Sequence, residues 1–174
     1  ITCSDGQTYK HENVTKQWAS LLAKAQRNNN KKQVAKISAK MVNIRKDWCH
    51  KVTTNIIKNN EIIYIGDVQT NAIIQKHNKG FNKALYDASL YQLKTMLKYK
   101  AQLLGSLLIE VNEAYTTQKC SNCGGIVGPK GEAGLNIRTW ICPNCLAEHD
   151  RDVNAAKNIM NKGKALSFSS ANKT

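Results

Sequence analysis

Two pairs of cysteines are the residues of this sequence with the most specific chemistry. Cys120 and Cys123 form one Cys-x-x-Cys pair, Cys142 and Cys145 form a second, and eighteen residues separate the pairs. A two-residue gap lets one tight turn present two thiolates to the same ion, and four thiolates satisfy tetrahedral zinc. The spacing therefore predicts a four-cysteine zinc ribbon whose zinc is structural, because no coordination position stays open for water.

Two disulfides are the alternative use of these four cysteines. Other marks of a secreted disulfide scaffold are absent, and the remaining cysteines, Cys3 and Cys49, lie far from the ribbon and are predicted to be free thiols. No apolar run reaches a membrane-spanning length, and the first residues do not have the pattern of a signal peptide. We expect no membrane partner and a cytoplasmic, nucleoid-associated location.

The charge balance points to a polyanionic partner. The chain has 174 residues and a net charge of +14. Its cations concentrate in a helical stretch over residues 15–58, where eleven Lys and Arg accompany a single acid, Asp47. Clustered Lys and Arg are how proteins hold a nucleic-acid backbone. The predicted phosphate contacts in this stretch are Lys31, Lys32, Lys36, Lys40 and Arg45.

The elements that position these residues follow from hydrophobic periodicity. Apolar residues at steps of three and four predict two helices within 15–58, and Asn28, Asn29 and Asn30 interrupt the pattern. The other predicted elements are a hairpin around Asp5 and Gly6, buried strands at 61–68 and 107–112, a loop over 69–80, a helix from Tyr86 to Gly105, and a short helix from Asp152 to Met160.

This order is typical of an α/β fold with a ribbon inserted late. The predicted divisions are a core over 1–114, the zinc ribbon over 115–148, a closing helix over 149–162 and a flexible tail over 163–174. A first strand before Ile1 would complete the sheet, so we expect an upstream portion to be missing.

Three sequence motifs together resemble the TnpB family, the RNA-guided nucleases of insertion sequences that are related to type V CRISPR effectors. The motifs are Glu110-Val111-Asn112-Glu113-Ala114-Tyr115-Thr116-Thr117-Gln118-Lys119-Cys120-Ser121-Asn122-Cys123-Gly124, Arg138-Thr139-Trp140-Ile141-Cys142-Pro143-Asn144-Cys145, and Asp150-Arg151-Asp152-Val153-Asn154-Ala155-Ala156. The resemblance implies an RNase H-like (RuvC) fold, here lacking its first strand and interrupted by the ribbon. It also implies guide RNA and target DNA as partners, with base pairing supplying specificity.

The nuclease site of that family needs three carboxylates, because two divalent ions must be held by hard oxygen ligands. The resemblance places the third carboxylate at Asp152, the second at Gly66, and the first before Ile1. Asp67 should point to the opposite face of the strand from residue 66. Asp152 has a structural alternative, which is to cap the last helix.

With one carboxylate of three, the chain is predicted to be a nuclease-dead binder or repressor-like protein. One alternative is an active RuvC-type DNA endonuclease portion whose remaining ligands lie upstream, and only that reading would require Mg²⁺. Another is a zinc-ribbon nucleic-acid-binding protein or transposon remnant without catalysis. A nucleobase deaminase is excluded, since four thiols close the zinc and no His-x-Glu element is present. Near the ribbon, the expected nucleic-acid contacts are Lys119, Arg138 and Arg151.

Overall fold

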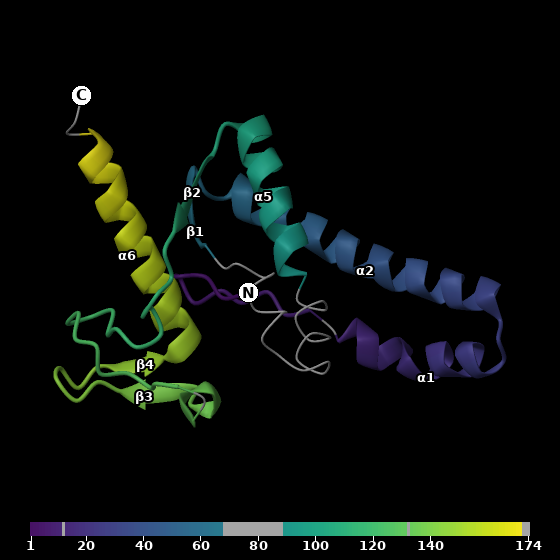
Figure 1. Ribbon diagram of the computed structural model, residues 1–174. Helices are drawn as coiled ribbons and strands as arrows, with labels where there is room; N and C mark the ends of the chain where they lie inside the picture. The colour runs from purple at the N-terminus through teal and green to yellow at the C-terminus, as the bar shows by residue number, and fades with distance from the viewer. Residues whose placement is uncertain (12, 68–88, 132, 172–174) are drawn as a thin grey trace. The chain divides into compact units, whose positions relative to one another are not determined.

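The computed structural model describes residues 1–11, 13–67, 89–131 and 133–171, and it divides into two compact units (Figure 1). Unit 1 comprises Ile1–Tyr9, Ile62–Val68 and Leu108–Thr174, and unit 2 comprises Lys10–Glu61 and Gln69–Leu107. The predicted loop over 69–80 and the predicted helix start at Tyr86 lie outside the described residues.

Unit 2 begins with two helices joined by the asparagine run. Helix α1 spans Val14–Arg27 and α2 spans Lys31–Lys58. The side chain of Asn13 accepts from the backbone N–H of Lys16 at 2.8 Å, and that of Asn30 accepts from Gln33 at 3.0 Å. Each asparagine therefore satisfies a backbone donor that the first helical turn leaves unpaired. The predicted pair of helices and the break between them are confirmed.

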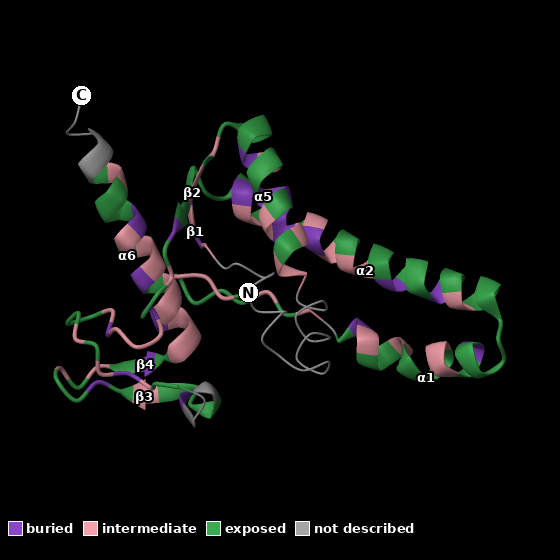
Figure 2. Ribbon diagram, viewed as in Figure 1, coloured by how far each residue is buried: buried purple, intermediate pink, exposed green. Residues whose placement is uncertain are grey.

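The core of unit 2 lies along α2, which α1 and the third helix contact. Between α1 and α2 the buried residues are Val14, Ala25, Ile37 and Met41. Most other positions of both helices are exposed, as Figure 2 shows. The apolar stripe read from the sequence is thus a packing face, and the lysines lie outside it.

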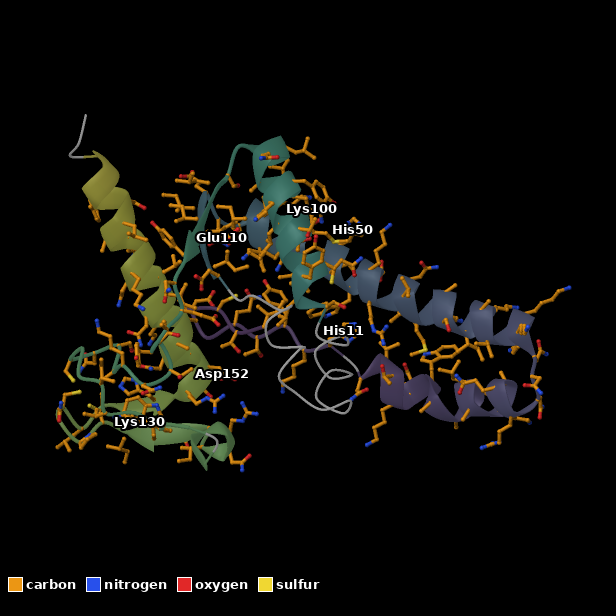
Figure 3. The ribbon with its side chains drawn as sticks, in the orientation of Figure 1. His11, His50, Lys100, Glu110, Lys130 and Asp152 are labelled. Carbon is orange, nitrogen blue, oxygen red and sulfur yellow. The ribbon has the colours of Figure 1, made fainter. Side chains whose placement is uncertain are left out.

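Helix α5 spans Leu90–Leu104 and ends at Gly105, whose φ of 74° gives the left-handed C-cap that the sequence predicts. Leu93, Leu97 and Ala101 are buried on the side of α5 that packs against α2. The ammonium of Lys100 donates to the carbonyl of His50 and to the hydroxyls of Thr53 and Thr54 at 2.7–2.8 Å (Figure 3). These bonds tie α5 to α2 by a polar contact as well.

Unit 1 contains the hairpin and two parallel strands. Gly6, with a φ of 89°, lies in the predicted turn, and Thr2 pairs with Thr8. Strand β1 spans Ile62–Gly66 and β2 spans Leu107–Val111. Their direction follows from two hydrogen bonds, Leu107 N–H to Glu61 O at 2.7 Å at one end and Asp67 N–H to Val111 O at 2.9 Å at the other.

These strands are less buried than their apolar sequences predict. Ile62 is 50% exposed and Leu107 is 53% exposed. The expectation of burial on both faces is therefore wrong at the start of each strand, since in the described structure these two strands form a sheet of their own. The buried positions are Ile63 and Gly66 in β1 and Val111 in β2.

Helix α6 spans Arg151–Ala171 and packs against β1. It continues through residues 163–171, where the sequence predicts a tail. A Cβ at Gly163 would overlap the ring of Tyr64, and the Tyr64 hydroxyl lies 3.3 Å from the hydroxyl oxygen of Ser167. The helix continues past a glycine because that glycine allows close contact with β1.

The ribbon lies between β2 and α6 in the chain. Strand β3 (Thr139–Ile141) pairs antiparallel with β4 (Glu148–Asp150), with Trp140 opposite His149, and a short 3₁₀ helix spans Ala133–Asn136. Among the described residues, no helix is long and apolar enough to cross a bilayer.

Candidate metal centre and acidic site

Two similar turns carry the four cysteines. In the first, the backbone N–H of Gly124 donates to Cys120 O at 2.9 Å; in the second, Leu146 N–H donates to Cys142 O at 2.9 Å. Gly124 has a φ of 79° and Leu146 a φ of 59°, so each turn closes on a left-handed residue. In the first turn this residue is a glycine, which adopts a positive φ without steric cost.

The four sulfurs form one cluster. Their Sγ atoms all lie within 4.8 Å of one another, and the pairs Cys120–Cys145 and Cys123–Cys142 are each separated by 3.7 Å. Thiolates around a tetrahedral ion at a zinc–sulfur distance would be about 3.8 Å apart. All four cysteines are free thiols rather than disulfides. The cluster is one that could hold a metal ion.

Hydrogen bonds and burial shift the pKa values of two of these cysteines in opposite directions. The side chain of Asn122 and the backbone N–H of Ala147 lower the pKa of Cys145 to about 6. The backbone N–H of Gly125 also lowers the pKa of Cys123, but burial and hydrogen bonds to the other three cysteines outweigh it and raise that pKa to about 11. A metal ion that converts all four thiols to thiolates must therefore displace protons.

His149 touches the cluster from outside. Its Nε2 lies 3.0 Å from the sulfur of Cys120, and its ring packs on Trp140 with centroids 4.8 Å apart. The residue is 8% exposed. A ring N–H at this place donates to the thiolate and orients it, as outer contacts of metal ligands do.

Two asparagines of α6 fasten the first cysteine turn to the helix. Asn154 and Asn158 both donate to the carbonyl of Lys119, at 2.8 and 2.6 Å, and both also reach the carbonyl of Thr116. The Asn154 oxygen accepts from Ser121 N–H at 2.8 Å. Because both asparagines are buried, their side chains satisfy backbone groups that water does not reach.

Asp152 occupies the first turn of α6 but is not its cap (Figure 3). Asp150 performs that role, because its Oδ1 accepts from the N–H groups of Asp152 and Val153 at 2.9 Å each. The carboxylate of Asp152 lies 3.4 Å from Arg138 and 3.6 Å from Arg151. Asp152 is therefore not the side-chain cap of α6, and its carboxylate pairs with Arg138 and Arg151.

A second acidic group lies at the end of β1, at the position where Gly66 has no side chain. A Cβ built on Gly66 would lie 2.5 Å from Oε2 of Glu113 and 3.4 Å from its Cδ. The Glu113 N–H donates to Oδ1 of Asp67 at 3.3 Å. The carboxylate beside position 66 thus comes from the residues that follow β2.

The expected phosphate contacts occupy different environments. On α2, Lys31, Lys32 and Lys36 are exposed. The Lys40 ammonium lies 5.2 Å from the centroid of the Trp18 ring, and Arg45 donates to the hydroxyl of Thr15 at 2.8 Å. The last two cations therefore also hold α1 against α2.

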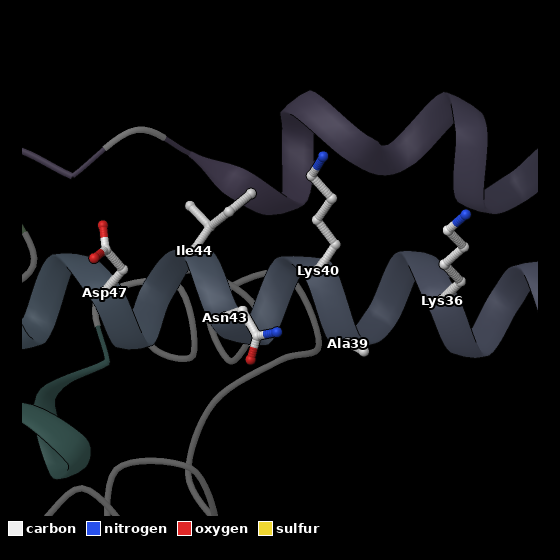
Figure 4. Close-up of a pocket in the computed structure, with 6 residues that line it drawn as sticks. All are labelled: Lys36, Ala39, Lys40, Asn43, Ile44 and Asp47. Carbon is white, nitrogen blue, oxygen red and sulfur yellow. The ribbon is translucent and has the colours of Figure 1, made fainter.

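Lys36 and Lys40 border a hollow of about 590 Å³ on α2 (Figure 4). The residues that line it are Lys36, Ala39, Lys40, Asn43, Ile44 and Asp47. Asp47 pairs with Lys51 at 2.7 Å. The hollow is bordered by two cations and one carboxylate that already has a cationic partner.

The cations expected to contact nucleic acid near the ribbon also occupy different environments. Lys119 is partly buried, whereas Arg138 is exposed and pairs with Asp152. The side chain of Arg151 is 14% exposed and donates to the carbonyl of Gly134 at 3.0 Å. Arg151 therefore has a structural contact inside the ribbon.

Sequence reasoning assigned no role to Glu113, His149 or Asn158. Each lies against a residue far along the chain. Glu113 lies beside Gly66, His149 contacts the sulfur of Cys120, and Asn158 donates to the carbonyl of Lys119. For Glu113 a signal existed, because the carboxyl ends of neighbouring parallel strands meet at one edge of the sheet, and Glu113 follows one such strand closely.

The cysteine cluster and the start of α6 lie within the part of the chain that matches a known protein family. The family described as "Cas12f1-like, TNB domain" matches residues 91–159, which include all four cysteines and the start of α6. A "Putative RNA-guided DNA endonuclease" of Streptomyces pristinaespiralis is 33% identical over 96% of this chain and 43% of its own length. The TnpB-like protein L79 of Acanthamoeba polyphaga mimivirus is 31% identical over 74% of this chain and 24% of its own length.

The fold is also shared with a solved structure, that of Cas12f1 in a complex with guide RNA and target DNA. The likeness has a TM-score of 0.59 at 16% identity and covers 83% of this chain and 41% of the Cas12f1 chain. This chain spans less than half of the length of each of these relatives. By these matches the chain belongs to the TnpB family, whose relatives here include putative RNA-guided DNA endonucleases.

Proposed function

We propose that this chain is the RuvC-like and zinc-ribbon part of an RNA-guided DNA-binding protein. The observation that carries the proposal is the similarity to an RNA-guided DNA endonuclease over 96% of this chain. Lys31, Lys32 and Lys36 of α2 support it, since they are exposed and lie outside the packing face of the helix. The partners are a guide RNA and a target DNA, and the location is the cytoplasm, at the nucleoid.

The metal of the cysteine cluster is zinc in this proposal. Four thiolates in a tetrahedral arrangement are the preferred ligands of structural zinc, and the sulfur separations of 3.7 Å fit its size. Bound zinc would stabilise the ribbon and supply no reactive water. Its importance for function is indirect, because the ribbon is fastened to the helix that carries Asp152.

The test is guide-dependent binding of DNA by the complete protein. A gel-shift titration compares a duplex that matches the guide with a scrambled duplex of equal length. We expect binding only to the matched duplex. Equal binding of both would contradict guide dependence and favour a zinc-ribbon protein with general nucleic-acid affinity.

The cationic surface of α2 makes a separate prediction about salt. Replacing Lys31, Lys32 and Lys36 by Gln should reduce the slope of log affinity against log salt by about 3, since each phosphate contact contributes a slope of about 0.9. Lys51→Gln is the matched control, because the Lys51 charge is already paired with Asp47 at 2.7 Å. An unchanged slope in the triple variant would show that these lysines do not contact phosphate.

Whether the protein also cuts DNA depends on position 66. Taken by itself, Gly66 predicts a nuclease-dead binder, because one carboxylate does not hold Mg²⁺ well. One observation favours a second candidate function, cleavage of DNA: the carboxylate of Glu113 lies beside position 66. Glu113 and Asp152 both belong to unit 1, and carboxylate oxygens are the ligands that a divalent ion of the Mg²⁺ class prefers. When bound, such an ion would stabilise charge on a reacting phosphate.

A further inference from the structure

Gly66 and Glu113 fit each other closely. The carboxylate oxygen of Glu113 is 2.5 Å from the point where a residue-66 Cβ would begin, which is closer than two non-bonded atoms can approach. Any side chain at position 66 would therefore displace this carboxylate. Glycine is what permits the carboxylate to lie against the end of β1.

The backbone that carries Glu113 is held on both sides. The ammonium of Lys162 donates to the carbonyls of Asn112 and Ala114 at 3.1 and 2.8 Å. The Asn112 side chain accepts from Ala114 N–H at 2.8 Å, and Asp67 accepts from the N–H of Glu113 itself. A fixed backbone positions the Glu113 side chain before any ligand arrives, which lowers the cost of binding one.

Helix α6 helps to position both Glu113 and Asp152. Lys162, which holds the Glu113 backbone, and Asp152 both belong to α6. Gly163, next to Lys162, fixes α6 against β1 through its contact with Tyr64. The position of Asp152 and the position of Glu113 therefore depend on one packed element of unit 1.

We propose that Glu113 supplies, from the residues after β2, the metal-binding carboxylate that position 66 lacks, so that this chain keeps a second acidic ligand for a divalent cation of the Mg²⁺ class. Asp67 is a positioning residue, because it acts on the Glu113 backbone. The inference rests on the proposed function and extends it. It replaces the interpretation of Gly66 as a lost ligand by one in which the ligand is supplied from the residues that follow the neighbouring strand β2.

The test measures binding of Mn²⁺, which takes the same oxygen ligands as Mg²⁺, by the electron paramagnetic resonance signal of the free ion. The complete protein, loaded with zinc, is compared with Glu113→Gln, which keeps the size of the side chain and removes its charge. We expect Glu113→Gln to weaken Mn²⁺ binding by about tenfold or more, because the affinity of such sites follows the number of charged ligands. Glu110→Gln, an exposed carboxylate on β2, is the matched control and should bind Mn²⁺ as the unchanged protein does.

Two further variants separate the position of the carboxylate from its presence. Gly66→Ala leaves Glu113 in the sequence but places a Cβ where its oxygen lies, and the displaced atom is the end of a flexible side chain. We expect this variant to fold and to weaken Mn²⁺ binding as Glu113→Gln does. The exchange variant Gly66→Glu/Glu113→Ala should recover Mn²⁺ binding, since it returns a carboxylate to the end of β1.

Cleavage and guide-dependent binding of matched DNA are recorded on the same samples. Mn²⁺ affinity unchanged in both Glu113→Gln and Gly66→Ala would overturn the role of Glu113, even if guided DNA binding stands. Loss of guided binding in the unchanged protein would refute the proposed function, while the Mn²⁺ titration would still decide about Glu113. A drop in Mn²⁺ affinity together with a drop in cleavage, at constant DNA affinity, is the expected result.

Discussion

His149 connects the cysteine cluster to the start of the last helix. Its ring is buried between Trp140 and the sulfur of Cys120, and the next residue along the chain is Asp150, the cap of α6. A donor to a thiolate spreads its negative charge and fixes the direction of its lone pairs. The contact therefore contributes to metal retention while the ring contributes to packing.

Replacing His149 by Phe should separate these two contributions. The ring still packs on Trp140, but the N–H is lost, and we expect metal affinity to fall by about tenfold, as for other outer contacts of metal ligands. Competition against a colorimetric zinc chelator measures this. Glu148→Gln, an exposed neighbour, should retain zinc like the unchanged protein. Equal affinities for His149→Phe and the unchanged protein would reduce His149 to a packing residue.

At this scale, the sequence predicts what is determined locally. The grouping of Cys120 with Cys123 needs only one turn, and spacing alone indicates it. The contact of His149 with Cys120 spans 29 residues and depends on the pairing of β3 with β4, which no local pattern encodes. The approach of Glu113 to Gly66 likewise depends on the pairing of β1 with β2.

Among the elements, α6 departs furthest from its prediction. Gly163 and the polar residues after it favour a helix end, and glycine inside a helix costs about 1 kcal/mol relative to alanine. The structure places Gly163 where α6 meets the ring of Tyr64. Helix propensity is thus overridden by a close contact between elements. By contrast, the break that Asn28, Asn29 and Asn30 make between α1 and α2 was predicted, because it follows from a local pattern.

Gly163→Ala tests this packing directly. Propensity alone would stabilise the variant by about 1 kcal/mol. Overlap of the new methyl group with Tyr64 should cost about 1–3 kcal/mol, so we expect a net loss of stability. Chemical denaturation of the zinc-loaded protein measures the change, with the exposed Lys164→Ala as the control. A more stable Gly163→Ala protein would mean that α6 does not approach β1 in this way, and in that case adding Tyr64→Ala should bring no relief.

At the scale of the whole molecule, the ribbon belongs to the same compact unit as β1 and α6, and the helices α1, α2 and α5 form the other. The sequence predicts a zinc ribbon over 115–148 as a separate division of the chain. Its limits were set by the cysteine spacing, which contains no information on the buried bonds from Asn154 and Asn158 to the backbone of Thr116 and Lys119. Those bonds make α6 depend on the ribbon.

Removal of zinc by a chelator should therefore affect more than the ribbon. Without the metal the turn at Cys120 is released, the carbonyl of Lys119 moves, and Asn154 and Asn158 lose the partners that offset their burial. Hydrogen exchange should show loss of protection in residues 116–150 and also in the first turns of α6, up to Asn158, while α2 and α5 keep theirs. Asn154→Ala should lose α6 protection with zinc still bound, since it breaks the same connection from the helix side. If chelation left α6 fully protected, the ribbon would be an independent module, and the position of Asp152 would not depend on zinc.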